Sequence, residues 1–367
     1  MGILRSIFGK SKHKKTEVVI TNITEFWNWF DENQEAFYKT VKTNGNIEKY
    51  FFSKLGPQLD QLRSKIFYVT GNYDDSAVEL IFTADGNLKN IAFIEELIEK
   101  SPNLPNWKFT ALKQPYQNFD FVINMGDLEF HENNITFYSN EDQDRPDLVD
   151  ITFVHEDWSE ENRETLINGI YLAIDNYLGE LKLIDGIDEI SFCSPSDATG
   201  ELVPINKLKE FLNWRAKEFV EKYEGVRINI EDYNYSGYES TTNERLPVIA
   251  IINSDLMNWD AKASHPWMMI VEMKFKGNDF GMPNDETCAL INEIEEEIML
   301  ELKDKDGYLN VGRQTVNFER AVFFTCVDYR KPSNLLFHIQ NKYKNIVDID
   351  FDIFKDKYWQ SLSRFGY

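Results

Sequence analysis

Apolar residues recur at two different spacings along this chain, and the two spacings alternate from one segment to the next. Within residues 21–64, Phe26, Trp29 and Phe30 follow the three- and four-residue spacing of a buried helical face. Over residues 107–111, apolar and polar residues alternate, which is typical of a half-buried strand. The segments follow no regular βαβ period. We therefore predict an α+β fold, in which each half is a mostly antiparallel sheet with helices packed on one face.

A length of 367 residues favours two domains. We expect a basic tail over residues 1–20, an N-terminal α+β domain over 21–200 and a C-terminal α+β domain over 201–367, joined by a linker at 194–204. In the second half, the patterns predict helices at 285–303 and 332–343, and strands at 247–253, 267–275 and 346–353 with a strand pair across 308–328. The alternation of Val226, Ile228 and Ile230 predicts one further strand.

Local signals predict several boundaries. Thr24 is a candidate N-cap for the first helix. Gly56-Pro57 should interrupt the next helix, because proline lacks the N–H that a helix interior needs. Asn133-Asn134 is a candidate hairpin turn, and the Tyr-, Ser-, Asn- and Gly-rich stretch 232–244 is expected to be a loop.

The charge of the chain is far from neutral. Its 62 acidic and 39 basic residues give a formal charge of −23, which disfavours whole-surface binding to nucleic acid. Hydrophobic residues make up 42% of the chain, enough for a core, so a disordered chain is excluded. Residues 1–15 carry five cations and no acid. This segment is expected to be either a solubilising tail or a weak contact with a membrane surface.

Nothing in the sequence predicts export or membrane insertion. No run of apolar residues approaches the length of a spanning helix, and no secretory signal is recognisable, so we expect a cytoplasmic protein. The three cysteines, Cys193, Cys288 and Cys326, are widely spaced and form no CxxC pair. They are therefore interpreted as reduced core residues rather than disulfide or zinc ligands.

Residues 247–365 contain an ordered series of short motifs. These are LPVIAIINSDL, HPWMMIVEMKF, GMPNDETCALINEIEEEI, the GRQT turn, ERAVFFTCVD and DKYWQSL. In this order they resemble the bacterial domain-of-unknown-function 695 family. The segment TADGNLKNIAFIEELIEKSPNLPNWKFTAL in the first half also resembles a stretch of uncharacterised bacterial proteins. Neither resemblance implies a catalytic residue, a cofactor or a partner.

The common catalytic and metal-binding motifs are missing from the sequence. His131 and His155 are expected on neighbouring strands, but HxH, HExxH and HxxxH are absent. The acidic stretch containing Asp142, Asp144 and Asp147 lacks the glycine and final glutamate of a calcium loop, so we expect a hydrated loop. Motifs for a serine nucleophile or a phosphate-binding glycine loop are also absent. We therefore predict no catalytic residues, no metal and no cofactor.

The strongest candidate for ligand binding is a pair of arginines on adjoining strands. Arg313 and Arg320, with Thr315 between them, could hold an anionic ligand, because guanidinium binds carboxylate and phosphate bidentately. They could instead pair internally with Glu295 or Asp328. Trp267 joins this candidate set, although the lack of a basic groove in this half favours a core or interface anchor over a stacking platform.

The predicted helix around residue 295 is strongly acidic. Its apolar stripe leaves Glu293, Glu296 and Glu297 on the expected solvent face. This face is either simply hydrated or a surface for a basic partner.

These observations favour a non-catalytic binding or regulatory protein that engages a basic protein partner through an acidic surface. The alternative is a hydrolase or a small anionic-ligand enzyme with its site around Arg313 and Arg320.

Overall fold

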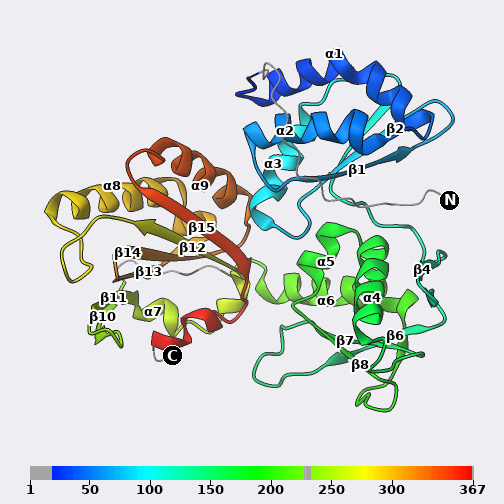
Figure 1. Ribbon diagram of the computed structural model, residues 1–367. Helices are drawn as coiled ribbons and strands as arrows, with labels where there is room; N and C mark the ends of the chain where they lie inside the picture. Colours follow the sequence, from blue (N-terminus) through cyan, green and yellow to red (C-terminus); the bar gives the residue numbers. More distant parts are fainter. Residues whose placement is uncertain (1–18, 227, 229–232, 366–367) are drawn as a thin grey trace. The chain divides into compact units, whose positions relative to one another are not determined.

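The structure is a computed structural model that describes residues 19–226, 228 and 233–365. The chain divides into two compact units (Figure 1). The first comprises the chain up to Asn140 together with Asp150–Phe211, and the second comprises Glu141–Val149 and Leu212–Tyr367. Both units combine helices with sheets in which antiparallel pairing predominates, which confirms the α+β fold class. The expected basic tail lies almost wholly outside the described residues.

The first unit begins with helices packed on a small sheet. Its elements are α1 (Ile23–Lys42), the π-helical turn η1 (Glu48–Phe52), α2 (Ser53–Leu62), β1 (Phe67–Asn72), β2 (Val78–Thr83), α3 (Leu88–Glu99) and β3 (Trp107–Ala111). The strand order is β1-β2-β3, and β3 runs parallel to β2 because α3 crosses between them. Aromatic rings of α1 form the core, with Trp27 and Phe30 edge-on to one another at 5.6 Å.

Two boundaries in this region differ from the sequence predictions. The N-cap of α1 is Asn22 and not Thr24, because the Asn22 side chain accepts the N–H of Glu25. Helix α2 continues through Pro57 instead of stopping there. A proline inside a helix costs about 3 kcal/mol. Burial of Leu55 and Leu59 on either side, at about 1.5–3 kcal/mol each, is sufficient to offset that cost.

The rest of the first unit contains a hairpin and a four-stranded sheet. Its elements are β4 (Ile123–Met125), β5 (Leu128–Phe130), β6 (Ile135–Asn140), β7 (Asp150–His155), α4 (Arg163–Leu178), α5 (Glu180–Gly186), β8 (Glu189–Cys193) and β9 (Val203–Pro204). The sheet has the order β8-β7-β6-β9. The hairpin turns at Gly126, which has a φ of 64°, and not at Asn133-Asn134 as expected. Asn133-Asn134 instead connects two strands of different sheets.

The second unit is built on one six-stranded sheet. Its strands are β10 (Tyr235–Thr241), β11 (Pro247–Asn253), β12 (Trp267–Lys274), β13 (Tyr308–Val316), β14 (Glu319–Cys326) and β15 (Asp348–Lys355). Their order is β10-β11-β13-β14-β12-β15, and every pair is antiparallel. The connecting elements are the short helices α7 (Ser254–Met257), η3 (Lys262–Ser264) and η4 (Asp304–Asp306), the helices α8 (Asp285–Glu301) and α9 (Arg330–Tyr343), and the C-terminal turn η5 (Gln360–Phe365). Helix α6 (Leu208–Tyr223), preceded by η2 (Ile205–Lys207), contains the boundary between the units.

The stretch expected to be a loop at 232–244 contains strand β10, so that prediction was wrong. The strand is an edge strand and most of its side chains are exposed. It therefore lacks the apolar alternation by which a strand is recognised. Pairing along β11, from Tyr235 opposite Asn253 to Thr241 opposite Pro247, determines its conformation. The strand predicted from Val226, Ile228 and Ile230 lies largely outside the described residues.

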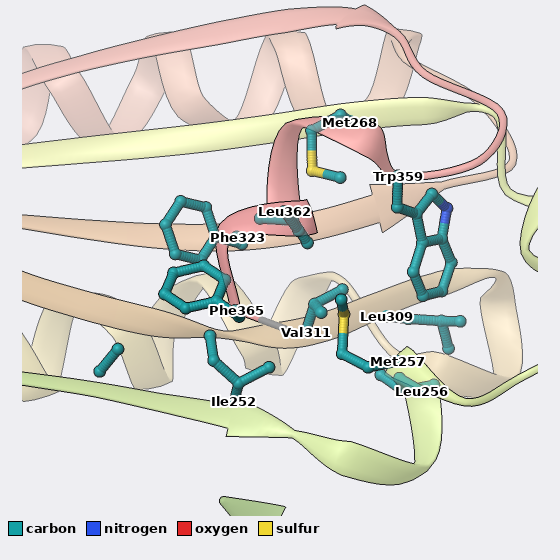
Figure 2. Packing of buried hydrophobic residues seen from close by; sticks show 11 residues of the cluster. Ile252, Leu256, Met257, Met268, Leu309, Val311, Phe323, Trp359, Leu362 and Phe365 are labelled. Carbon is teal, nitrogen blue, oxygen red and sulfur yellow. The ribbon is translucent and has the colours of Figure 1, made fainter. Parts of the chain in front are cut away.

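The two faces of the six-stranded sheet are covered differently. In Figure 1, α8 and α9 lie on one side of the strands, and α7 and the C-terminal segment lie on the other. Figure 2 shows Trp359, Leu362 and Phe365 of the C-terminal segment packed over strand residues such as Phe323. The Trp359 indole N–H also donates to the carbonyl of His265, at 3.1 Å. The C-terminal segment therefore covers part of the second face of the sheet.

Among the described residues, no helix has both the length and the apolar character needed to cross a membrane.

Substitution Leu362→Ala should lower the free energy of unfolding by about 3 kcal/mol, because Leu362 is fully buried and its removal leaves a cavity. The control is Leu300→Ala, where the side chain is 70% exposed on α8 and the expected change is within about 0.5 kcal/mol. Urea denaturation of the full chain measures both. Equal losses in the two variants would contradict the role of the C-terminal segment in the core.

Candidate functional site

The predicted arginine site forms a compact group beneath α8. Arg313 Nη1 donates to Glu295 Oε2 at 3.0 Å, and Arg320 Nη1 lies 3.7 Å from the same oxygen. Arg320 also donates through Nε to the Thr315 hydroxyl at 3.2 Å and through Nη1 to Asn292 Oδ1 at 2.6 Å. Of the two internal partners considered from sequence, Glu295 is therefore the one used.

The two arginines differ in burial, and this difference determines which of them could bind a ligand. Arg320 is 6% exposed, and burial followed by the positive charge of Arg313 lowers its pKa. Arg313 keeps about a third of its side chain exposed, at 33%. A buried guanidinium that already contacts a carboxylate, a hydroxyl and an amide is occupied by the protein itself. Within this group, Arg313 alone presents a cation to solvent.

Trp267 does not join this group. It lies at the start of β12, opposite Cys326, whereas Arg320 is opposite Met273 near the end of the same strand. Six residues of strand separate the two positions by about 20 Å. The Trp267 ring is buried and packs edge-on against Tyr329, with ring centroids 4.7 Å apart. Trp267 is therefore a core residue.

The acidic helix α8 was predicted to expose its glutamates. Glu293 and Glu296 are exposed, but Glu297 accepts hydrogen bonds from Lys342 Nζ at 2.6 Å and from the Tyr343 hydroxyl at 2.8 Å. Glu295 of the same helix is buried. Arg313 and Arg320 make the burial of this carboxylate possible, because they supply charge partners inside the protein.

A second acidic surface, not singled out from sequence, lies on the sheet itself. We call it the acidic sheet face, and it consists of Glu272, Glu319, Asp348, Asp350 and Asp352. Asp350 lies directly opposite Glu272, and Lys274 lies between Glu319 and Asp348. Residues directly opposite in an antiparallel pair point to the same face, so these carboxylates share one surface. The alternating aspartates of DIDFDIF were the sequence signal that could have identified it.

Electrostatics show that these carboxylates influence one another. Burial and then the negative charge of Glu272 raise the pKa of Glu319. Asp350 and Asp352 each accept the backbone N–H of the following residue, at 2.8 and 3.0 Å. Part of the donor set of edge strand β15 is thus satisfied by its own side chains, which is one way in which edge strands avoid non-specific pairing.

The second unit also contains a pocket of about 520 Å³ beside the C-terminal segment. Its lining residues are Asp142, Asp144, Arg145, Met257, Lys262, Tyr358, Trp359, Gln360 and Ser363. The first three come from the stretch that the sequence predicted to be a hydrated loop. Arg145 Nε donates to Asp142 Oδ2 at 2.7 Å, and Arg145 Nη1 donates to Gln360 Oε1 at 3.0 Å. The loop is thereby joined to the C-terminal segment.

Asp147 holds the same loop in place through hydrogen bonds to the end of α6 and to Tyr358. Its carboxylate accepts from Lys222 Nζ at 2.8 Å, from the Tyr223 hydroxyl at 2.7 Å and from the Tyr358 hydroxyl at 2.8 Å. Burial raises the pKa of Asp147, but these three donors outweigh burial and hold the pKa below its usual value. Lys357 donates to the Asp147 carbonyl at 2.7 Å. Asp147 is therefore a structural anchor of the pocket wall.

In the first unit, Glu180 forms a comparable buried anchor. It is 3% exposed and accepts from the Thr83 hydroxyl at 2.6 Å and from the backbone N–H of Lys113 at 3.3 Å. Lys113 itself pairs with Asp175 at 2.9 Å. These groups are matched donor to acceptor within the protein, which is typical of a structural network.

His155 is buried, and both of its ring nitrogens are in hydrogen bonds. Nδ1 accepts the N–H of Asp157 at 3.1 Å, so Nε2 carries the proton and donates to the carbonyl of Glu129 at 3.0 Å. Burial lowers the pKa of this histidine. Its ring therefore has no lone pair available for a metal. Within the ranges that the structure covers, no cluster of three or more His, Cys, Asp or Glu residues is arranged to hold a metal ion.

All three cysteines are unpaired thiols. Cys326 is buried and Cys193 and Cys288 are half-buried, so only Cys326 is fully a core residue.

Comparisons with protein-family models, with curated proteins and with solved structures find no match for this chain. The resemblance of residues 247–365 to the domain-of-unknown-function 695 family stays a prediction.

Asp147→Asn should lower the free energy of unfolding by about 2 kcal/mol at neutral pH, because it removes the charge that three donors share. The pKa of Asp147 is lower in the folded state than in the unfolded state. The ionised carboxylate therefore contributes its full share of the free energy of unfolding above the usual aspartate pKa of about 3.9, and this share is lost as the pH falls below that value. The difference between wild type and variant should shrink over that acidic range. Denaturant titrations at several pH values measure it.

The matched control is Asp279→Asn, which removes one charge from an exposed position of the same unit. A pH-independent loss in Asp147→Asn, or an equal loss in Asp279→Asn, would contradict the role of the ionised Asp147.

Proposed function

We propose that this protein is a non-catalytic binding module that engages a basic protein segment through the acidic sheet face of its second unit. The observation that carries the proposal is the register of β15, β12 and β14, which gathers five carboxylates and one lysine on one face. A cationic partner is the ligand that this charge pattern fits.

The arrangement costs the isolated protein some stability. Asp350 and Glu272 are directly opposite, and like charges in that position destabilise a sheet. At about 5 Å, two such charges repel by roughly 1–3 kcal/mol, depending on the effective dielectric constant. Lys274 offsets part of this repulsion. Lysine or arginine side chains of a partner would lower this repulsion further, so the charge pattern favours a cationic ligand there.

The partner would contact side chains rather than extend the sheet. The N–H groups of Phe351 and Ile353 on edge strand β15 are already bonded to aspartate side chains. Aspartates at alternate positions of a strand are about 6.8 Å apart on one face. An extended peptide with cations at every second residue has the same spacing, which makes it the partner of closest match.

The arginine group beneath α8 supports an enzyme or anion-binding function less well. Arg320 is buried and bonded to Thr315 and Asn292, and Glu295 occupies the space between the two guanidinium groups. Neither Arg313 nor Arg320 is among the residues that line the pocket beside the C-terminal segment.

A labelled peptide with lysine and threonine in alternation should bind the full chain, and raised salt should weaken binding because exposed ion pairs are screened. The triple variant Asp348→Asn, Asp350→Asn, Asp352→Asn should raise Kd about tenfold, because three exposed pairs contribute roughly 0.2–1 kcal/mol each. Fluorescence anisotropy at low and high salt measures both effects.

The matched control removes three charges from α8 through Glu286→Gln, Glu293→Gln and Glu296→Gln, all at exposed positions. It should leave Kd nearly unchanged. Loss of binding only in this control would show that α8, and not the acidic sheet face, is the partner surface. Equal losses in both variants would show that binding depends only on the net charge of the protein. Binding that ignores salt would count against the proposal altogether.

A further inference from the structure

The pocket beside the C-terminal segment contains two charged groups that the protein does not pair. Lys262 is half-buried, its Nζ lies 6.0 Å from the centre of the Trp359 ring, and its ammonium group forms no hydrogen bond or ion pair with any described residue. Asp144 is exposed, and its carboxylate accepts no hydrogen bond and forms no ion pair with any described residue. Both side chains line the same pocket.

Apart from the Ser363 hydroxyl, the other polar side chains of the pocket already have partners within the protein. Arg145 and Asp142 neutralise each other at 2.7 Å. The Tyr358 hydroxyl donates to Asp147 at 2.8 Å, and the side-chain oxygen of Gln360 accepts from Arg145 at 3.0 Å. The charges that remain for a ligand are therefore one ammonium and one carboxylate.

Of the two charged groups, the Lys262 ammonium group has the greater need of an opposite charge, because it is partly buried. Partial desolvation lowers the pKa of Lys262, and the negative charge of Asp260 opposes this shift only in part. A cation that has lost part of its hydration without gaining a carboxylate is stabilised by an anionic group that enters the same space.

The charge of the whole protein restricts which anions can enter. A chain with a formal charge of −23 repels small anions before they reach the pocket. A zwitterion carries no net charge and escapes this long-range repulsion, yet it presents a carboxylate and an ammonium group at short range. A volume of about 520 Å³ lies within the usual range for small-molecule sites and accommodates a short peptide.

We propose that this pocket binds a small zwitterion of the amino-acid or short-peptide class, with Lys262 taking its carboxylate and Asp144 its ammonium group. Met257 and Trp359 supply the apolar part of the pocket lining. The proposal concerns a different surface from the acidic sheet face and does not depend on it.

The experiment titrates the full chain with glycine, diglycine and triglycine by isothermal titration calorimetry. Each added residue separates the two charges by at most about 3.5 Å, so the member that binds best reports the distance between the two contacts. Acetate and methylammonium, which each carry a single charge, should bind at least tenfold more weakly than the best zwitterion. Equal binding of acetate, or no binding by any of the three zwitterions, would overturn the proposal.

Lys262→Gln and Asp144→Asn should each raise the Kd of the best zwitterion at least tenfold. The control variants Lys305→Gln and Asp279→Asn remove the same charges from exposed positions outside the pocket, and should leave Kd within about twofold because distant surface charges are screened. Unchanged affinity in Lys262→Gln would also overturn the proposal.

Urea denaturation midpoints of the four variants show whether each is folded. Should Lys262→Gln fail to fold, Lys262→Arg replaces it: arginine keeps the charge, so binding within about threefold of wild type supports the assignment and its loss contradicts it.

Discussion

The second unit depends on the packing of its C-terminal segment against one face of the six-stranded sheet. Trp359, Leu362 and Phe365 bury their side chains there, and the Trp359 indole is bonded to the carbonyl of His265. Burial of three large apolar side chains supplies the principal driving force. The same packing determines which part of this sheet face is left to solvent, and it also forms one wall of the pocket. Both proposed binding surfaces therefore follow from this single contact.

The two surfaces differ in how their charges are arranged. The acidic sheet face gathers like charges, of which Asp350 opposite Glu272 is the clearest case, so its net charge selects a cationic partner. The pocket balances an unpaired ammonium against an unpaired carboxylate, at Lys262 and Asp144, and therefore selects a ligand with both charges. The arginine group beneath α8 shows a third arrangement, in which Glu295 satisfies the cations internally. From sequence alone, a pair of arginines is consistent with any of these three arrangements of charge.

Much of the fold is predictable from local pattern, and the errors have identifiable causes. Strand β11 has the predicted bounds because its apolar residues are dense and bounded by turn signals. Strand β10 was missed because an exposed edge strand carries no apolar alternation, and hydrogen bonds to β11 determine its structure. Helix α2 passes through Pro57 because tertiary burial outweighs a local preference. The candidate site was less predictable: Arg313, Thr315 and Arg320 do converge, but Trp267 lies at the other end of the sheet.

The sequence by itself determined the α+β class, the positions of most helices and strands, and the acidic character of the protein, because each of these depends on neighbouring residues or on composition. Only the tertiary structure decided which surfaces are available. Periodicity tells which residues share a face of a strand, but it does not tell whether another segment covers that face. Arg145 and Gln360 are 215 positions apart in the chain, and their hydrogen bond joins the two walls of the pocket. Contacts at such separation depend on how the whole chain packs, and no local pattern encodes them.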